Sequence, residues 1–299
     1  MNLAYFWGIF LGSLHAMVPI TLTATGEVIG ESAGLFNIGL EGIILLSAMT
    51  GALGAEAGGP AVGLLVGLGT GLVMGLVFGW VCTYFKGIQL IAGVGINLFA
   101  AGLVTFWLIH LGVPGHHAVA AESQMVNIST PYGDFSPMIF VAITLPVLIY
   151  ILLFRTKLGL KIRAVGENPQ AADVAGIKIH LLRLLSTAAG ASLAGLAGAY
   201  ISIDWLGSVT KEISAGRGFI ALATVVFSGL NPLLALLGGF IFGFFENLAV
   251  WVATMPAVQK IIPWQFVAMA PYAVTLLVVT GVIGRARFPA AMGIPYERE

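Results

Sequence analysis

Apolar segments about as long as a lipid bilayer is thick make up most of this chain. Nine of them are recognisable, at residues 3–24, 35–55, 60–83, 88–111, 137–154, 184–203, 218–230, 232–254 and 264–284. A helix needs about 20 apolar residues to cross the hydrocarbon core, and backbone in lipid must satisfy its own hydrogen bonds. We therefore expect an all-α, polytopic membrane protein with about 8–9 transmembrane segments, built as a single domain over residues 1–299.

The composition agrees with this fold class and excludes several others. Charged residues make up 9% of the chain, against about 25% in soluble domains, and the mean hydropathy is +1.00. The formal net charge is zero, which argues against nucleic-acid binding. Cys82 is the only cysteine, so no disulfide can form within the chain.

Small residues recur every four positions in two of the apolar segments. The segment 60–83 carries Gly63, Gly67, Gly71, Gly75 and Gly79, and the segment 184–203 carries Gly190, Ala194 and Gly198. Small residues on one helix face let two backbones approach closely. We expect both segments to make tight helix crossings. The segment 218–230 is too short to cross a bilayer alone, and we expect a half-helix or a re-entrant piece there.

One long loop is basic. Residues 155–183 hold six of the thirteen Lys and Arg residues, whereas the loop 112–136 has none. Because cytoplasmic loops are enriched in Lys and Arg, we expect the loop 155–183 to be cytoplasmic and the loop 112–136 to lie outside. Arg285, Arg287 and Arg298 then place the C-terminus inside. Nine crossing segments place the N-terminus outside, whereas a re-entrant segment 218–230 changes the parity and places it inside.

The basic loop also carries the signals of a short helix. Asn168 is a favourable N-cap, Pro169 suits a first helical position, and Gly176 is typical of a helix end. A helix exposed by a membrane protein to the cytoplasm is suited to docking a partner. This loop is the strongest indication of function in the residues themselves.

Enzyme motifs are absent from the sequence. Neither the phosphate-loop pattern GxxxxGK[ST] nor the zinc pattern HExxH occurs, and the adjacent pair His116–His117 has no evident third ligand. We expect no catalytic residues, no metal site and no cofactor in this chain. Any transport against a gradient would take its energy from a partner or from a coupled ion.

Polar residues inside apolar segments are candidates for a solute path, because such residues are costly in a membrane and often functional. With nearby aromatic residues, the candidates are Asn37, Glu41, Asn97, Phe99, Trp107, Glu246 and Asn247. Structural roles are equally open: Glu41 lies near a helix start, and Asn97 and Glu246 can bond neighbouring helices. No Lys or Arg is evidently placed to pair with the acids. Aromatic residues beside polar ones suit a neutral, hydroxylated ring solute better than an ion.

Four blocks of the sequence resemble a known transporter family. They are GEVIGESAGLFNIGLEGIILLSAMTGA (26–52), KGIQLIAGVGINLFAAGLVTF (86–106), RTKLGLKIRAVGENPQAADVAGI (155–177) and GRGFIALATVVFSGLNPLLALLGGFIFGFFENL (216–248). In this order, they resemble ABC-importer permeases of the nucleoside and simple-sugar branch, relatives of ribose-type and branched-chain amino-acid permeases. The run from Asn37 to Gly42, NIGLEG, is similar to that branch in particular.

The resemblance implies a division of labour among several proteins. This chain would be one of two related permease subunits, and a cytoplasmic ABC ATPase would use the ATP. An extracytoplasmic solute-binding lipoprotein would deliver a small neutral polar solute. Residues 166–177 would form the helix that docks on the ATPase, through Gly166, Glu167, Asn168, Pro169, Ala171, Ala172, Asp173 and Gly176. On this view, a bulky charged residue at Gly166 or Ala172 uncouples transport without unfolding the bundle.

Two other hypotheses stay open at this point. The chain can be an ion-coupled secondary carrier that uses Glu41 and Glu246 as proton sites, which predicts uptake sensitive to a protonophore. It can also be a membrane scaffold or receptor subunit, for which the loop 155–183 is only an interaction surface. All three hypotheses place the protein in the cell membrane as a multi-pass protein.

Overall fold

The computed structural model describes residues 3–130, 133–255 and 288–297, together with residues 265–266, 269–270, 272–273 and 276. The helices are α1 (Leu3–Ser32), α2 (Leu40–Gly58), α3 (Pro60–Thr83), α4 (Gln89–His110), α5 (Pro137–Arg155), α6 (Lys157–Glu167), α7 (Pro169–Val174), α8 (Ile179–Tyr200), α9 (Arg217–Ser228) and α10 (Pro232–Thr254). A π-helical turn at Ile201–Trp205 extends α8.

Seven helices in the described part of the chain are long and apolar enough to cross a membrane: α1 to α5, α8 and α10. The expected short segment 218–230 is the short helix α9, which begins at Arg217 and ends at Ser228. The ninth predicted segment, 264–284, lies largely outside the described residues. The chain is thus a polytopic helical bundle, as its apolar segments predict.

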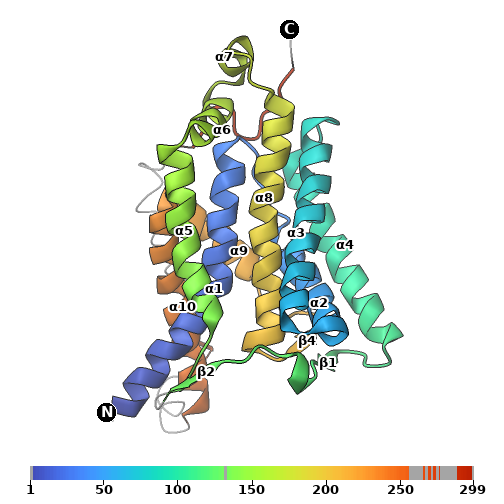
Figure 1. Cartoon of the computed structure of the whole chain (residues 1–299), viewed down its shortest axis with the longest axis vertical. Coiled ribbons are helices and arrows are strands. Elements are labelled where there is room, and N and C mark those ends of the chain that lie inside the picture. The colour runs from blue at the N-terminus through green and yellow to red at the C-terminus, as the bar shows by residue number, and fades with distance from the viewer. Residues whose placement is uncertain are drawn as a thin grey trace.

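The two ends of the bundle differ in composition and shape. At one end, which we call the α7 end, the helices α6 and α7 and the C-terminal residues lie together (Figure 1). At the opposite end, the β end, β1 (His116–Ala118) pairs antiparallel with β4 (Ser208–Thr210). There β2 (Ile128–Thr130) also pairs antiparallel with β3 (Gly133–Phe135). The N-terminus lies at the β end as well (Figure 1).

The glycine repeat of α3 makes the tight helix crossing that its spacing predicts. A Cβ atom at Gly71 would lie 2.3 Å from the carbonyl oxygen of Ala191 in α8, and one at Gly67 would lie 2.4 Å from the Cβ of Ala199. On the other side of α8, a Cβ at Gly198 would lie 2.2 Å from the carbonyl oxygen of a residue in α2. The helix α8 is therefore a central element, packed closely on both α2 and α3.

The basic loop differs from its prediction in two respects. The helix α8 begins at Ile179, so Arg183 belongs to this helix, where it is 2% exposed, and not to the exposed loop. The predicted helix 166–177 is also interrupted, because α6 ends at Glu167 and α7 begins at Pro169. Proline has no N–H to continue the bonding of α6, and Asn168 instead caps a new helix.

Candidate functional site

Two helices begin inside the bundle rather than at its ends. The helix α2 begins at Leu40, after a non-helical segment at residues 33–39, and α9 begins at Arg217, directly after Gly216. Gly34 and Gly216 have φ angles of 92° and 80°, which glycine adopts without steric cost. Both helix starts carry N–H groups that need partners from elsewhere in the bundle.

The side chain of Glu41 joins these two helix starts. Its Oε1 atom accepts the N–H of Gly216 at 2.7 Å, and its Oε2 atom accepts the N–H of Gly218 at 2.7 Å. Glu41 lies in the first turn of α2, so its carboxylate is close to the N-termini of two helices. Helix dipoles favour a negative charge at this position. One carboxylate therefore caps α9 and holds it against α2.

Two asparagines hold the backbone around the start of α2. The Oδ1 atom of Asn97, in α4, accepts the N–H of Gly42 at 2.7 Å, and its Nδ2 atom donates to the carbonyl of Ile38 at 3.1 Å. The Oδ1 atom of Asn37 accepts the N–H of Gly39 at 2.9 Å. Asn37, Glu41 and Asn97, predicted separately, thus belong to one cluster around the start of α2.

Two further side chains, not predicted as site residues, complete the support of the segment 33–39. Glu27 in α1 accepts the N–H of Asn37 at 2.7 Å, and Gln89 in α4 accepts the N–H of Phe36 at 2.7 Å. Non-helical backbone at membrane depth is tolerated where protein groups satisfy it. Glu27 precedes the segment closely in sequence and Gln89 lies two helices beyond it, and nothing in their positions indicates that they bond to it.

Arg217 is the main residue that the sequence reasoning missed. It lies between the two glycines that Glu41 bonds, it is 7% exposed, and its guanidinium forms an ion pair with Glu246 of α10. It also donates to the carbonyl of Ile213 at 3.0 Å and lies 4.6 Å from the ring centre of Trp205. The expectation that no Lys or Arg pairs with the acids was therefore wrong. A lone Arg between two glycines at the start of an apolar helix is the sequence signal that could have identified it.

Asn247 faces away from this cluster. Its Nδ2 atom donates to the carbonyl of Ile9 in α1 at 2.8 Å and lies 3.4 Å from the hydroxyl of Ser13. A Cβ at Gly12 would lie 2.3 Å from its Oδ1 atom, so the amide is pressed against the α1 backbone. Asn247 therefore makes a contact between α10 and α1 in this conformation.

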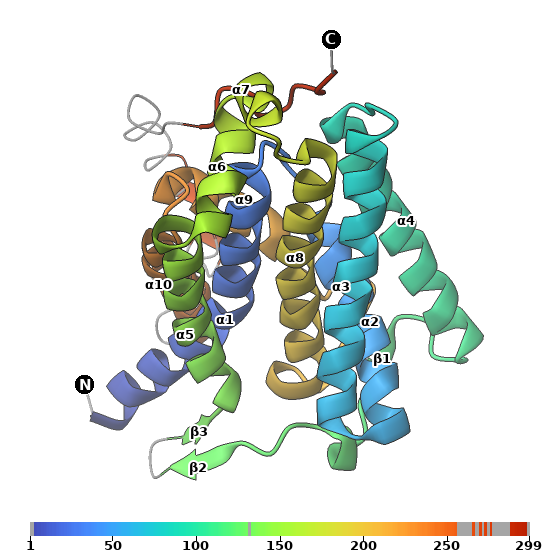
Figure 2. The same ribbon diagram turned by 45° about the horizontal axis from the view of Figure 1, so that its top comes forward.

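Phe99 and Trp107 also lie apart from the polar cluster, on α4 at the edge of the bundle (Figure 2). Phe99 is 54% exposed and borders an apolar cavity of about 450 Å³ between α3 and α4. Trp107 packs edge-on against His110, with ring centres 5.6 Å apart. The structure thus brings Asn37, Glu41 and Asn97 together, links Glu246 to them through Arg217, and leaves both aromatic residues outside.

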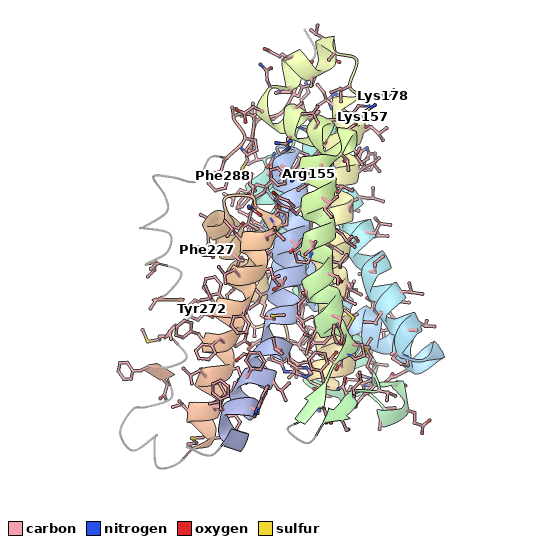
Figure 3. The ribbon with its side chains drawn as sticks, turned by 60° about the vertical axis from the view of Figure 1, so that its left-hand side comes forward. Arg155, Lys157, Lys178, Phe227, Tyr272 and Phe288 are labelled. Atoms are coloured by element: carbon pink, nitrogen blue, oxygen red, sulfur yellow. The ribbon has the colours of Figure 1, made fainter. Side chains whose placement is uncertain are left out.

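The helix α7 is the most projecting part of the α7 end (Figures 1 and 2). The Oδ1 atom of Asn168 accepts the N–H of Ala171 at 3.0 Å, and Pro169 holds the first helical position. Gly176 has a φ of 78° and follows the helix end. The cap, the proline and the stop are thus confirmed. Arg155, Lys157 and Lys178 lie around this end of the molecule (Figure 3).

The predicted docking residues divide into exposed and buried ones. Glu167, Asn168, Ala171 and Gly176 are exposed, Pro169 and Asp173 are partly exposed, and Gly166 and Ala172 are buried. A Cβ at Gly166 would lie 2.3 Å from the carbonyl oxygen of Ser32, the last residue of α1. A bulky residue at Gly166 would therefore disturb the bundle itself, contrary to our expectation from the sequence. Val174 is 92% exposed and is a better probe of docking.

The C-terminal residues 288–297 bind across the α7 end. The N–H of Ala291 donates to the carbonyl of Gly166 at 3.0 Å, and the N–H of Gly293 donates to the carbonyl of Gly34 at 3.2 Å. Arg183 of α8 donates to the carbonyl of Ile294 at 3.0 Å. This tail therefore connects α6 and α8 to the segment that precedes α2.

Two side chains of the tail extend these contacts. The hydroxyl of Tyr296 donates to Oδ2 of Asp173 in α7 at 2.9 Å. Lys86, in the turn between α3 and α4, donates to the carboxylate of Glu297, and this hydrogen bond and positive charge lower the pKa of Glu297. The ion pair is exposed and adds little stability. The tail thus has partners both on α7 and in the turn between α3 and α4.

Comparison with known protein families identifies the family of this chain. The family model described as "Branched-chain amino acid transport system / permease component" matches residues 9–283. The chain belongs to this family. With seven apolar helices in the described residues, the permease is a multi-pass membrane protein.

Curated relatives of the permease match it over nearly its whole length. It is 34% identical to the guanosine ABC transporter permease protein NupQ of Bacillus subtilis, covering 93% of this chain and 92% of the relative. It is 30% identical to the nucleoside ABC transporter permease protein NupC of Lactococcus lactis, covering 93% of each. The putative glucose ABC transporter permease protein TsgC13 of Haloferax volcanii is 28% identical, covering 98% of each. No solved structure matches the permease.

Proposed function

We propose that this permease is a transmembrane subunit of an ATP-driven importer for nucleosides. The full-length similarity to two permeases named for guanosine and nucleosides supports this solute class over glucose, for which the named relative is less similar. ATP would be bound and hydrolysed by a partner ATPase, not by this chain. The α7 end, with the C-terminus, would face the cytoplasm, as its exposed basic residues favour.

The observation that carries the coupling proposal is the exposure of α7. This helix projects beyond the membrane-spanning helices, presents Val174 almost fully exposed, and packs on the bundle through the buried side of Ala172. An exposed apolar side chain on a short, well-capped helix is suited to a groove on a protein partner. We place the ABC ATPase there.

A continuous series of contacts leads from α7 to the membrane interior. The tail joins α7 and α6 to Gly34, and residues 33–39 lead directly into α2 and Glu41. A displacement of α7 by the ATPase would therefore pull on the segment that positions Glu41 against α9. In this proposal, separating Glu41 from the start of α9 accompanies the change between outward and inward openings.

The remaining partners follow from the proposed importer. A second, related permease would complete the path, and an extracytoplasmic lipoprotein would deliver the solute at the β end. The polar cluster of Asn37, Glu41 and Asn97 is engaged in bonds within this chain, so we assign it to conformational change. Which residues contact the solute would then depend on the second subunit.

The ion-coupled carrier is less well supported by the geometry. Such a carrier would use Glu41 and Glu246 as proton sites, but Glu41 accepts two backbone N–H groups and Glu246 is paired with Arg217. In both arrangements the carboxylate holds the start of α9 to another helix. Each of these two acids holds helices together, and a proton on its carboxylate would weaken that contact.

Crosslinking from α7 tests the docking proposal. Cys82 is buried, so a cysteine introduced at Val174 is a selective exposed thiol, and Val126 at the β end, 87% exposed, provides a matched control. In membranes containing the whole transporter, Val174→Cys is expected to crosslink to the ATPase and Val126→Cys is not. Equal crosslinking of the ATPase by both variants, or by neither, would contradict docking on α7.

Uptake into proteoliposomes tests the solute and the energy source. With the complete transporter, radiolabelled guanosine is expected to accumulate with ATP, and a protonophore is expected to have no effect. An ATPase subunit with an inactivated nucleotide site provides the control. Uptake of glucose but not guanosine would overturn the solute class, and uptake that needs a proton gradient but no ATP would overturn the importer.

A further inference from the structure

A sealed polar compartment lies between α1 and α8. The two helices, adjacent in Figures 1 and 2, cross so closely that a Cβ at Gly26 would lie 2.3 Å from the carbonyl oxygen of Gly190. Just beyond this crossing, α1 carries Glu27 and Glu31, which are 2% and 0% exposed. They are one helical turn apart and so share a face of α1.

Several polar atoms of this compartment have no hydrogen-bond partner among the described residues. They include both carboxylate oxygens of Glu31 and the hydroxyl of Thr187, which is 2% exposed. Burying such groups unpaired is unfavourable, most of all for a carboxylate. The compartment is therefore incomplete without a further group.

The position of Gly30 marks a small space lined by oxygen. A Cβ at Gly30 would meet the carbonyl oxygen of Leu35 at 3.5 Å, the hydroxyl of Thr187 at 3.6 Å and Oε2 of Glu27 at 3.7 Å. These three oxygens come from the segment 33–39, from α8 and from α1. Oxygen atoms of carboxylate, hydroxyl and carbonyl groups are the ligands of hard cations.

The two buried carboxylates favour a cation as the missing group. Arg183 precedes Thr187 by one helical turn in α8. Its guanidinium donates to the carbonyls of Ala33 at 3.1 Å and Ile294 at 3.0 Å. No ion pair within the described residues joins it to Glu27 or Glu31. Glu27 and Glu31 share one face of α1, and a small cation between them would stabilise both buried carboxylates.

We propose that this compartment binds a monovalent cation of the size of Na⁺, ligated by Glu27, Thr187 and the carbonyl of Leu35. Glu31 lies one helical turn from Glu27 on the same face of α1. Because Glu27 also accepts the N–H of Asn37, the ion fixes the segment that leads into α2 against both α1 and α8. The site goes beyond the proposed function, and its test needs neither nucleoside nor ATP.

Equilibrium binding of ²²Na⁺ and thermal unfolding test the proposal on the transporter complex in nanodiscs. Choline chloride replaces NaCl at constant ionic strength, since choline is too large for the site. The expected results are saturable binding and an unfolding temperature that rises with Na⁺. Gly30→Ala adds a methyl group at ordinary contact distances, so it keeps the fold but fills the space. We expect it to weaken Na⁺ binding by about 10- to 100-fold, like the loss of a supporting ligand.

Matched variants locate the site. Thr187→Val keeps the shape of the side chain but removes its oxygen, and it is expected to weaken Na⁺ binding as Gly30→Ala does. Gly102→Ala places a methyl group where no atom lies within 4 Å, and it is expected to leave binding unchanged. Absence of Na⁺ binding in the unmodified complex would overturn the proposal in favour of a protonated carboxyl group. Binding that survives both Gly30→Ala and Thr187→Val would overturn the assigned location.

Discussion

The carboxylate of Glu41 and the backbone N–H of Gly216 lie 2.7 Å apart, although 175 residues separate them in the chain. Gly218 completes the contact by donating to the second carboxylate oxygen. The two helices that begin inside the bundle are thereby joined at their N-termini by one side chain. Any motion that separates α2 from α9 must break both hydrogen bonds.

Glu41→Gln tests this junction. An amide offers one oxygen where the carboxylate offers two, so one backbone N–H of the α9 start loses its acceptor. We expect the free energy of unfolding to fall by about 1–3 kcal/mol and transport to fall with it. Thermal unfolding and guanosine uptake measure the two effects. Glu212→Gln, at an exposed position, is the control, and equal behaviour of the two variants would contradict a role for the junction.

The ion pair of Arg217 and Glu246 predicts how the stabilities of two single variants and their double variant compare. Arg217→Met leaves Glu246 without its partner, and we expect a loss of about 3–5 kcal/mol, as when buried ion pairs are broken. Glu246→Gln leaves Arg217 unpaired and is expected to be similarly harmful. The double variant Arg217→Met with Glu246→Gln leaves no charge and is expected to regain part of the stability. Strictly additive losses in thermal unfolding would show that the two side chains do not interact.

Substitution by alanine is predicted to have opposite effects on stability at two glycines of α3 that are two residues apart. A Cβ at Gly71 would lie 2.3 Å from a carbonyl oxygen of α8, whereas one at Gly69 meets no atom within 4 Å. We expect Gly71→Ala to destabilise the bundle by about 1–3 kcal/mol through overpacking. Gly69→Ala is expected to be neutral or to stabilise by about 0.5–1 kcal/mol, because alanine favours the helix. Unfolding temperatures in one lipid mixture compare the two variants directly.

The tail predicts a local effect on α7. Tyr296→Phe removes the hydroxyl that donates to Asp173, a contact of about 1 kcal/mol. We expect faster hydrogen exchange in residues 169–174 with little change in global unfolding, and weaker coupling of ATP hydrolysis to uptake. Tyr150→Phe in α5 is the control. Unchanged exchange in α7 would mean that Tyr296 does not hold this helix.

Local signals in the sequence were sufficient for much of the α7 end. Asn168, Pro169 and Gly176 each act through bonds and dihedral angles within a few residues, so the start and end of α7 follow from residue type. Arg183 shows where this reasoning ends. Its position after a basic run indicated a solvated loop, but helix α8 had already begun, and backbone carbonyls of two distant segments surround its guanidinium.

The sequence by itself determined that the chain is a helical membrane protein and which helices pack closely. Length, apolarity and glycine spacing act within one helix, so their consequences do not depend on the rest of the fold. Only the tertiary structure decided the partners of Glu41, Glu246 and Asn247. A polar side chain in an apolar segment must find a hydrogen-bond partner, but the partner is chosen by the crossing of distant helices. The contact of Glu41 with the start of α9 is set in this way.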